Sequence, residues 1–90
     1  MDLRITEERR GDVSVVQVAG RLSGEGVEEL GATCRSAAGR GRLRLDLSAL
    51  LQADEVGLAL LRSLREAGTE LAGASPFIQL LLEGKRSDPV

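Results

Sequence analysis

Residues 43–61 of the chain, LRLDLSALLQADEVGLALL, decide the fold because the spacing of their leucines changes partway along. Leucines alternate with polar residues over 43–47, which is typical of a strand with one buried face. From 58 to 64 they recur at helical spacing instead. We therefore expect a strand at 43–47, then a turn, then a helix from Glu55 to about Ala67 that stops at Gly68.

The expected helix begins with two acidic residues. Asp54 is a suitable N-cap because its carboxylate can accept the backbone N–H of Gly57, and Glu55 then lies in the first turn near the positive end of the helix dipole. Both anions should be exposed. Acids at a helix start stabilise it by about 0.3 to 1 kcal/mol, so the residues by themselves require no partner to explain them.

The segments before this unit predict a hairpin and a helix. Leu3–Glu7 and Val13–Val18 have strand character and are separated by a turn glycine, so we expect them to pair antiparallel. Ser23 can cap a helix near Glu25–Ala38, which the glycines of 39–41 should end.

The segments after it predict a short strand at Glu70–Ala74 and a last helix to about Glu83, with Ser75 as N-cap, Pro76 as its first residue and Gly84 as its stop. Strands joined through helices pair in parallel. The expected fold is α/β, with a four-stranded mixed sheet formed by an N-terminal antiparallel hairpin and then parallel strand-helix-strand units, and three helices mainly on one face. We expect a single domain over residues 1–84 and a C-terminal tail over 85–90.

Composition argues against several classes of function. The net charge is −2 and Phe77 is the only aromatic residue, so the chain has neither the basic field nor the stacking rings of a nucleic-acid-binding protein. No apolar run approaches the roughly 20 residues of a membrane helix, so we expect no direct membrane insertion. Histidine is absent and Cys34 is the only cysteine, so we expect no metal site, no cofactor, no enzyme activity and no disulfide, and a cytoplasmic location.

Three segments together resemble one family. Asp46-Leu-Ser48, an apolar spacer and Asp54-Glu-Val-Gly-Leu58 resemble the signature of STAS domains, the bacterial anti-sigma factor antagonists and their relatives. Val16–Leu22 and Gly73–Pro76 are similar to that family's second strand and to its fourth strand with the following helix start. The resemblance covers about residues 3–84 and implies a STAS-like fold.

The resemblance also implies a site and a mechanism. In the family, a Ser or Thr directly after the capping Asp is phosphorylated, which releases the domain from an anti-sigma kinase; the equivalent position here is Glu55, which has no hydroxyl. The docking surface of the family implicates the following residues as partner-binding: Asp54, Glu55, Val56 and Gly57, with Gly20, Leu22 and Ser23 on the adjacent loop and Ser48 on the turn below.

Three functions follow from these expectations. The first is a non-catalytic regulatory protein-binding module of the anti-sigma factor antagonist type that cannot be phosphorylated at the usual switch position, with an anti-sigma kinase as its partner. The second is an accessory STAS subunit of a lipid or anion transporter ATPase complex. The third is a subunit of a homodimer or larger homo-oligomer, because the chain ends before the final strand and helix of longer family members, which leaves a sheet edge open. Glu55 could mimic the released, phosphorylated state or pair with an arginine of a different partner.

Overall fold

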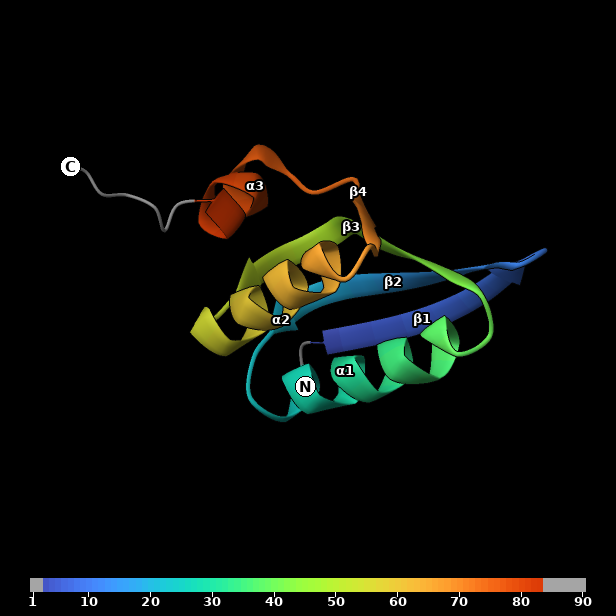
Figure 1. The fold of residues 1–90 in the computed structure, drawn as a ribbon. Coiled ribbons are helices and arrows are strands. Elements are labelled where there is room, and N and C mark those ends of the chain that lie inside the picture. Colours follow the sequence, from blue (N-terminus) through green and yellow to red (C-terminus); the bar gives the residue numbers. More distant parts are fainter. Residues whose placement is uncertain (1–2, 84–90) are drawn as a thin grey trace.

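The computed structural model describes residues 3–83 and contains a four-stranded mixed sheet with three helices, as the sequence predicts (Figure 1). The strands are arranged in chain order, β1-β2-β3-β4; β1 and β2 are antiparallel, and the other neighbours are parallel. The elements are β1 (Leu3–Arg10), β2 (Val13–Leu22), α1 (Glu25–Ala38), β3 (Arg42–Ala53), α2 (Glu55–Glu66), β4 (Glu70–Ala72) and α3 (Pro76–Glu83).

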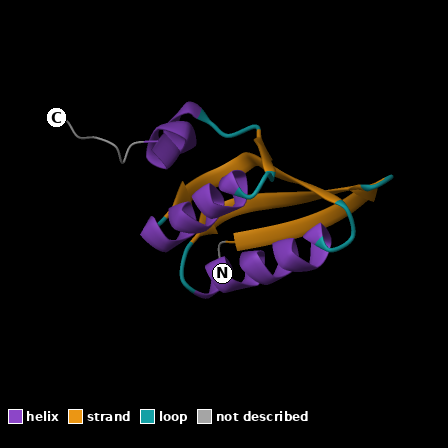
Figure 2. Ribbon diagram, in the orientation of Figure 1, coloured by secondary structure: helices purple, strands orange, loops and turns teal. Residues whose placement is uncertain are grey.

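One layer of helices covers one face of the sheet. Helices α1 and α2 lie side by side across it, and α3 lies beside α2 next to β3 (Figure 2). Between the layers is an aliphatic core, centred on Val16 and Val18 of β2, Leu45 and Leu47 of β3, and Leu61 of α2, all with no exposed surface. The only aromatic side chain, Phe77, is 52% exposed, so aliphatic packing alone stabilises the core.

No helix within residues 3–83 covers the opposite face of the sheet (Figure 1). The side chains of Arg4, Arg42 and Arg44 are exposed there, and Arg44 Nε lies 3.2 Å from Glu70 Oε1. Their alternation with the core leucines along β3 is the period-2 pattern that the sequence shows. The sheet therefore has one apolar face, which the helices cover, and one polar face, which we call the bare face.

Strand β3 is longer than predicted. The sequence indicates a turn after Leu47, but the strand continues to Ala53 and pairs with β2 over its whole length. The register shifts twice, opposite Gln17–Ala19 and Gly20–Arg21, which marks two bulges. A bulge inserts an extra residue and bends the strand without ending it, so the simple alternation of leucines is lost after 47 while the strand persists.

The starts of α2 and α3 agree with the sequence, whereas the start of α1 differs. Ser75 Oγ accepts the N–H of Ile78 at 3.2 Å, which confirms it as the cap of α3. Ser23 is not the N-cap of α1; that residue is Gly24, and none of the side chains in the described part of the chain caps the helix. Gly24 has φ 56° and ψ −129°, a conformation that side-chain-bearing residues rarely adopt, so the turn is made one residue later than expected.

The last strand is also shorter than predicted, ending at Ala72 instead of Ala74. The expected stop at Gly84 and the expected tail at 85–90 lie outside the described residues. None of the helices within residues 3–83 combines the length and apolarity needed to span a bilayer.

Candidate protein-docking site

The start of α2 has the local geometry that the sequence predicts. Asp54 is the N-cap, and its Oδ1 accepts the backbone N–H of Gly57 at 2.7 Å. Glu55 is the first residue of the helix and is exposed. One carboxylate is therefore fixed by the helix it caps, while the other lies in solvent at the positive end of the helix dipole.

Exposed apolar side chains precede and follow these acids in the chain. Val56 is 62% exposed and Leu51, near the end of β3, is 68% exposed. We call the exposed side chains of Leu51, Asp54, Glu55 and Val56 the α2 surface. Sequence reasoning missed Leu51 because it falls in the spacer of the motif, where the bulges of β3 turn Leu50 into the core and leave its neighbour outside.

The α2 surface is held against the end of β2 by a close backbone approach. The N–H of Asp54 donates to the Leu22 carbonyl at 3.1 Å. A Cβ added to Gly57 would lie only 2.8 Å from that same oxygen, so the first turn of α2 packs on β2 at a distance that only glycine permits. The expected residue Leu22 has a fully buried side chain, and Gly57 is buried too, so both support the surface from below.

The remaining predicted residues of the adjacent loop occupy different places. Gly20 lies within β2 with φ 95°, not in a loop. Ser23 is exposed in the link to α1, where its carbonyl accepts the N–H of Gly26 at 3.0 Å. Residues 21–23 and 52–54 border a shallow depression of about 210 Å³. This is smaller than the 300 to 1,000 Å³ usual for small-molecule sites, which favours contact with a protein surface.

Ser48 does not lie on a turn below this surface. It belongs to β3, beside the first bulge, and roughly 15 to 20 Å of extended chain separates it from Asp54. Its backbone N–H and its hydroxyl donate to Asp46 Oδ1 at 3.0 and 2.7 Å, and these bonds hold the pKa of the Asp46 carboxyl below its usual range. The Asp-Leu-Ser segment therefore stabilises the bend of β3 where pairing with β4 ends.

Among the described residues, other reactive groups do not gather into a second site. Cys34 is buried in the core, and this burial raises the pKa of its thiol to about 11, which keeps it protonated and unreactive. Within residues 3–83, His, Cys, Asp and Glu side chains nowhere form a group of three that could hold a metal ion. On the α2 surface, exposed apolar and acidic residues are close neighbours in the sequence.

Comparisons with known proteins agree with this architecture. The family described as "Mlab, STAS domain" matches residues 5–86. The anti-sigma factor antagonist SpoIIAA in its unphosphorylated form is 21% identical with a TM-score of 0.68, over 89% of this chain and 82% of that one. An antisigma-factor antagonist STAS domain from Rhodobacter sphaeroides is 24% identical with a TM-score of 0.58, over 83% of this chain and 94% of that one.

A third similar structure is a transporter that is much longer than this chain. The murine anion transporter Solute Carrier 26 family member A9 is 16% identical with a TM-score of 0.64, over 86% of this chain but only 14% of the transporter. No curated protein matches the chain. At these identities the solved structures show the shared fold, whereas the family match extends over nearly all of the sequence. The chain therefore belongs to the STAS domain family.

Proposed function

We propose that the chain is a non-catalytic regulatory module of the anti-sigma factor antagonist type that binds a protein partner through the α2 surface. The observation that carries this proposal is the exposure of Leu51 and Val56, which precede and follow the Asp54 cap in the chain. Exposed aliphatic side chains beside oriented charges have the composition of a protein interface, where apolar groups supply affinity and charges supply selectivity.

Glu55 gives this surface a permanent charge. A phosphorylated serine carries about −1.5 to −2 at neutral pH and can be made or removed, whereas the Glu55 carboxylate is a fixed monoanion. The module would then lack the covalent switch at this position. Its binding would be set by the abundance of the partner, or by modification of the partner.

The partner surface that fits best has an apolar recess bordered by basic side chains. Leu51 and Val56 would enter the recess, and an Arg or Lys of the partner would pair with Glu55. If instead the partner surface is acidic or poorly solvated around this position, the Glu55 carboxylate would oppose docking, as a phosphate would. The sign of the effect of Glu55 on affinity distinguishes these two cases.

Substitutions at the α2 surface test the proposal once native capture has identified the partner. Glu55→Ser, Glu55→Arg, Asp54→Ala and Val56→Ser should each change the dissociation constant at least tenfold, about 1.4 kcal/mol. Glu66→Ser, at the exposed opposite end of α2, is the matched control and should leave binding unchanged. Glu55→Ser tightens binding if the carboxylate opposes docking and weakens it if the carboxylate pairs with a base.

Two results would contradict the proposal. Affinities equal to wild type for all four variants would show that the α2 surface is not the docking site. Phosphate found at Ser48 or Ser63 after incubation with the partner kinase and ATP would show that the switch persists at another position.

The second candidate, an accessory subunit of a transporter ATPase, rests on the likeness of this chain to a part of an anion transporter. It uses the same surface but a different partner. Capture should recover a membrane-associated transporter ATPase in this case, and a soluble kinase-like ATPase under the first proposal.

A further inference from the structure

Strand β1 forms a long terminal edge of the sheet. It extends from Leu3 to Arg10, whereas β4 at the other edge consists only of Glu70–Ala72 (Figure 1). An edge strand can accept a further strand through its unpaired backbone groups, and an edge of three residues is too short to hold one firmly. The edge that can support strand pairing is therefore β1.

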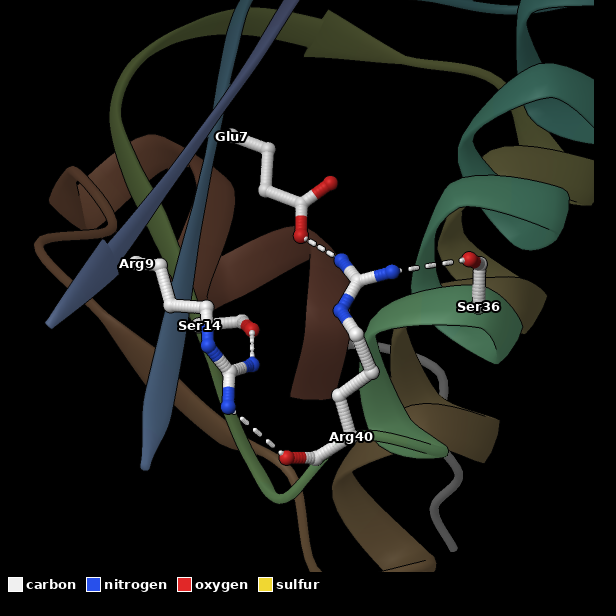
Figure 3. Close-up of polar contacts among 5 residues, drawn as sticks. All are labelled: Glu7, Arg9, Ser14, Ser36 and Arg40. Atoms are coloured by element: carbon white, nitrogen blue, oxygen red, sulfur yellow. Dashed lines mark hydrogen bonds and ion pairs between the residues drawn. The ribbon is translucent and has the colours of Figure 1, made fainter. Parts of the chain in front are cut away.

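The two faces of β1 carry different charges. Register with β2 places Glu7 and Arg9 on the helix side, opposite the buried Val16 and Ser14. Both are bound internally (Figure 3): Arg40 pairs with Glu7, while Arg9 donates to Ser14 Oγ at 3.3 Å and to the Arg40 carbonyl at 3.1 Å. The charged side chains on the helix side of β1 are therefore engaged in contacts within the chain.

The bare face of β1 is different. Here Arg4, Thr6, Glu8 and Arg10 alternate along the edge, and all four are exposed. The one ion pair among them that the structure records joins Arg10 Nε to Glu8 Oε2 at 3.4 Å, with both side chains more than 60% exposed. Pairs of this kind contribute little, so Glu8 can exchange its partner at small cost.

We propose that β1 is a self-association surface, and that a second copy of this chain pairs with it antiparallel about a two-fold axis at Thr6. Thr6 then lies opposite Thr6 of the second copy. Arg4 lies opposite Glu8 of the second copy, and Glu8 opposite Arg4, so two ion pairs form on the bare face. The product is one continuous eight-stranded sheet with both helix layers on the same side.

Charge selects this register over its neighbours. The two-fold axis is perpendicular to the sheet, so each residue of β1 lies opposite a residue of the second copy that is on the same face. Two of the possible registers use most of the strand. The proposed one pairs residues 3–9 and gains two opposite-charge pairs. The other pairs residues 4–10; it places Arg4 opposite Arg10 twice and Glu7 opposite itself. Like charges directly opposite each other destabilise a sheet.

Shorter registers are no better. The one centred on Ile5 gains no ion pair, and those centred on Arg4, Glu8 or Arg9 place a like-charge pair on the axis. The charged side chains of β1 therefore disfavour most pairings of this edge but favour the register centred on Thr6. Helix α1 packs mainly on β2 and β3, which leaves the terminal strand available.

Sedimentation equilibrium of the full chain tests the surface. A contact limited to one strand edge should give a weak dimer, with a dissociation constant of about 10 μM to 1 mM. Glu8→Arg places arginine opposite Arg4 twice in the proposed register and should raise this constant at least tenfold. Arg4→Glu combined with Glu8→Arg restores opposite charges and should return it to within about threefold of wild type. Glu66→Arg, the same charge change on an exposed helix position, should have no effect.

Disulfide trapping reports the register. Cysteine at position 6 (Thr6→Cys) would lie opposite its own copy at about 4.5 to 5.5 Å between Cα atoms, which permits a disulfide, so covalent dimer should accumulate under mild oxidation. Gln17→Cys places an exposed thiol on the same face, directly across from Thr6 but one strand further from the axis, and should not cross-link. Wild type, whose Cys34 is buried, should not cross-link either.

Three results would overturn the proposal. The first is a chain that stays monomeric at about 1 mM, the upper end of the range expected for the dissociation constant. The second is a dimer that Glu8→Arg leaves intact. The third is cross-linking through Gln17→Cys as readily as through Thr6→Cys.

Discussion

Replacing Gly57 with alanine should destabilise the protein although alanine favours helices. The added Cβ would lie 2.8 Å from the Leu22 carbonyl oxygen, 3.1 Å from Leu22 Cγ and 3.2 Å from Asp54 Oδ1. The first of these atoms is backbone in a paired strand and cannot turn aside. The third is the capping oxygen, so relief of the overlap also displaces the cap of α2.

The expected magnitude follows from opposing terms. Alanine in a helix gains about 0.5 to 1 kcal/mol over glycine. Overpacking against fixed atoms costs about 1 to 3 kcal/mol, and a weakened cap costs up to about 1 kcal/mol more. With each term near the middle of its range, the free energy of unfolding should therefore fall by about 2 kcal/mol.

Gly31 provides a matched control in α1. A Cβ there would meet Arg35 Nη1 at 3.5 Å and the methyls of Leu60 at 3.9 and 4.0 Å, which are ordinary contacts. Gly31→Ala should therefore keep the helix gain of about 0.5 to 1 kcal/mol. The same substitution at two buried helical glycines should thus change the free energy of unfolding in opposite directions.

Urea unfolding followed by far-UV circular dichroism measures both variants. With a slope near 1 kcal/mol per molar urea, the midpoint should fall by about 2 M for Gly57→Ala and rise by about 0.5 to 1 M for Gly31→Ala. Equal shifts of the two midpoints, or a rise for Gly57→Ala, would refute the claim that close approach to Leu22 positions α2.

Three further predictions concern single side chains. Asp54→Ala should lower the free energy of unfolding by about 1 kcal/mol, and Asp54→Ser by much less, because serine still caps the helix; thermal unfolding checks this. Cys34 has its pKa raised from 9.0 to about 11 in the folded protein, so its stabilising contribution is complete below pH 9 and is lost as the pH rises toward 11. Relative to Cys34→Ala, wild type should lose about 2 to 3 kcal/mol over that range, and a parallel pH profile of the two would contradict the assignment. Arg62 donates to the carbonyls of Leu82 and Leu81 at 2.8 and 3.0 Å, so Arg62→Met should lose about 1.5 to 3 kcal/mol and speed amide exchange first in α3, with unchanged exchange there as the contrary result.

The sequence was sufficient wherever structure is decided by neighbouring residues. Asp54 caps α2 and Ser75 caps α3 as predicted, because a capping oxygen reaches an amide only three residues away. The mixed sheet was also predictable, since two strand-helix-strand units after a hairpin leave few alternatives. These signals are local and their chemistry is specific.

The sequence was not sufficient where distant residues decide the outcome. The bulges of β3 depend on its register against β2, which alternation within β3 alone does not report. Their position determines that Leu50 is buried and Leu51 exposed, and so determines part of the α2 surface. The start of α1 was misplaced for a different reason: a serine and a glycine are adjacent at 23 and 24, and both are common at helix starts.

The absence of rings from the core has an experimental consequence. The chain has no tryptophan and no tyrosine, and its single phenylalanine lies on the surface. The protein is therefore nearly transparent at 280 nm and does not emit on excitation there. In a titration, any tryptophan fluorescence that changes on complex formation must come from the other protein, so binding can be followed without a label on either molecule.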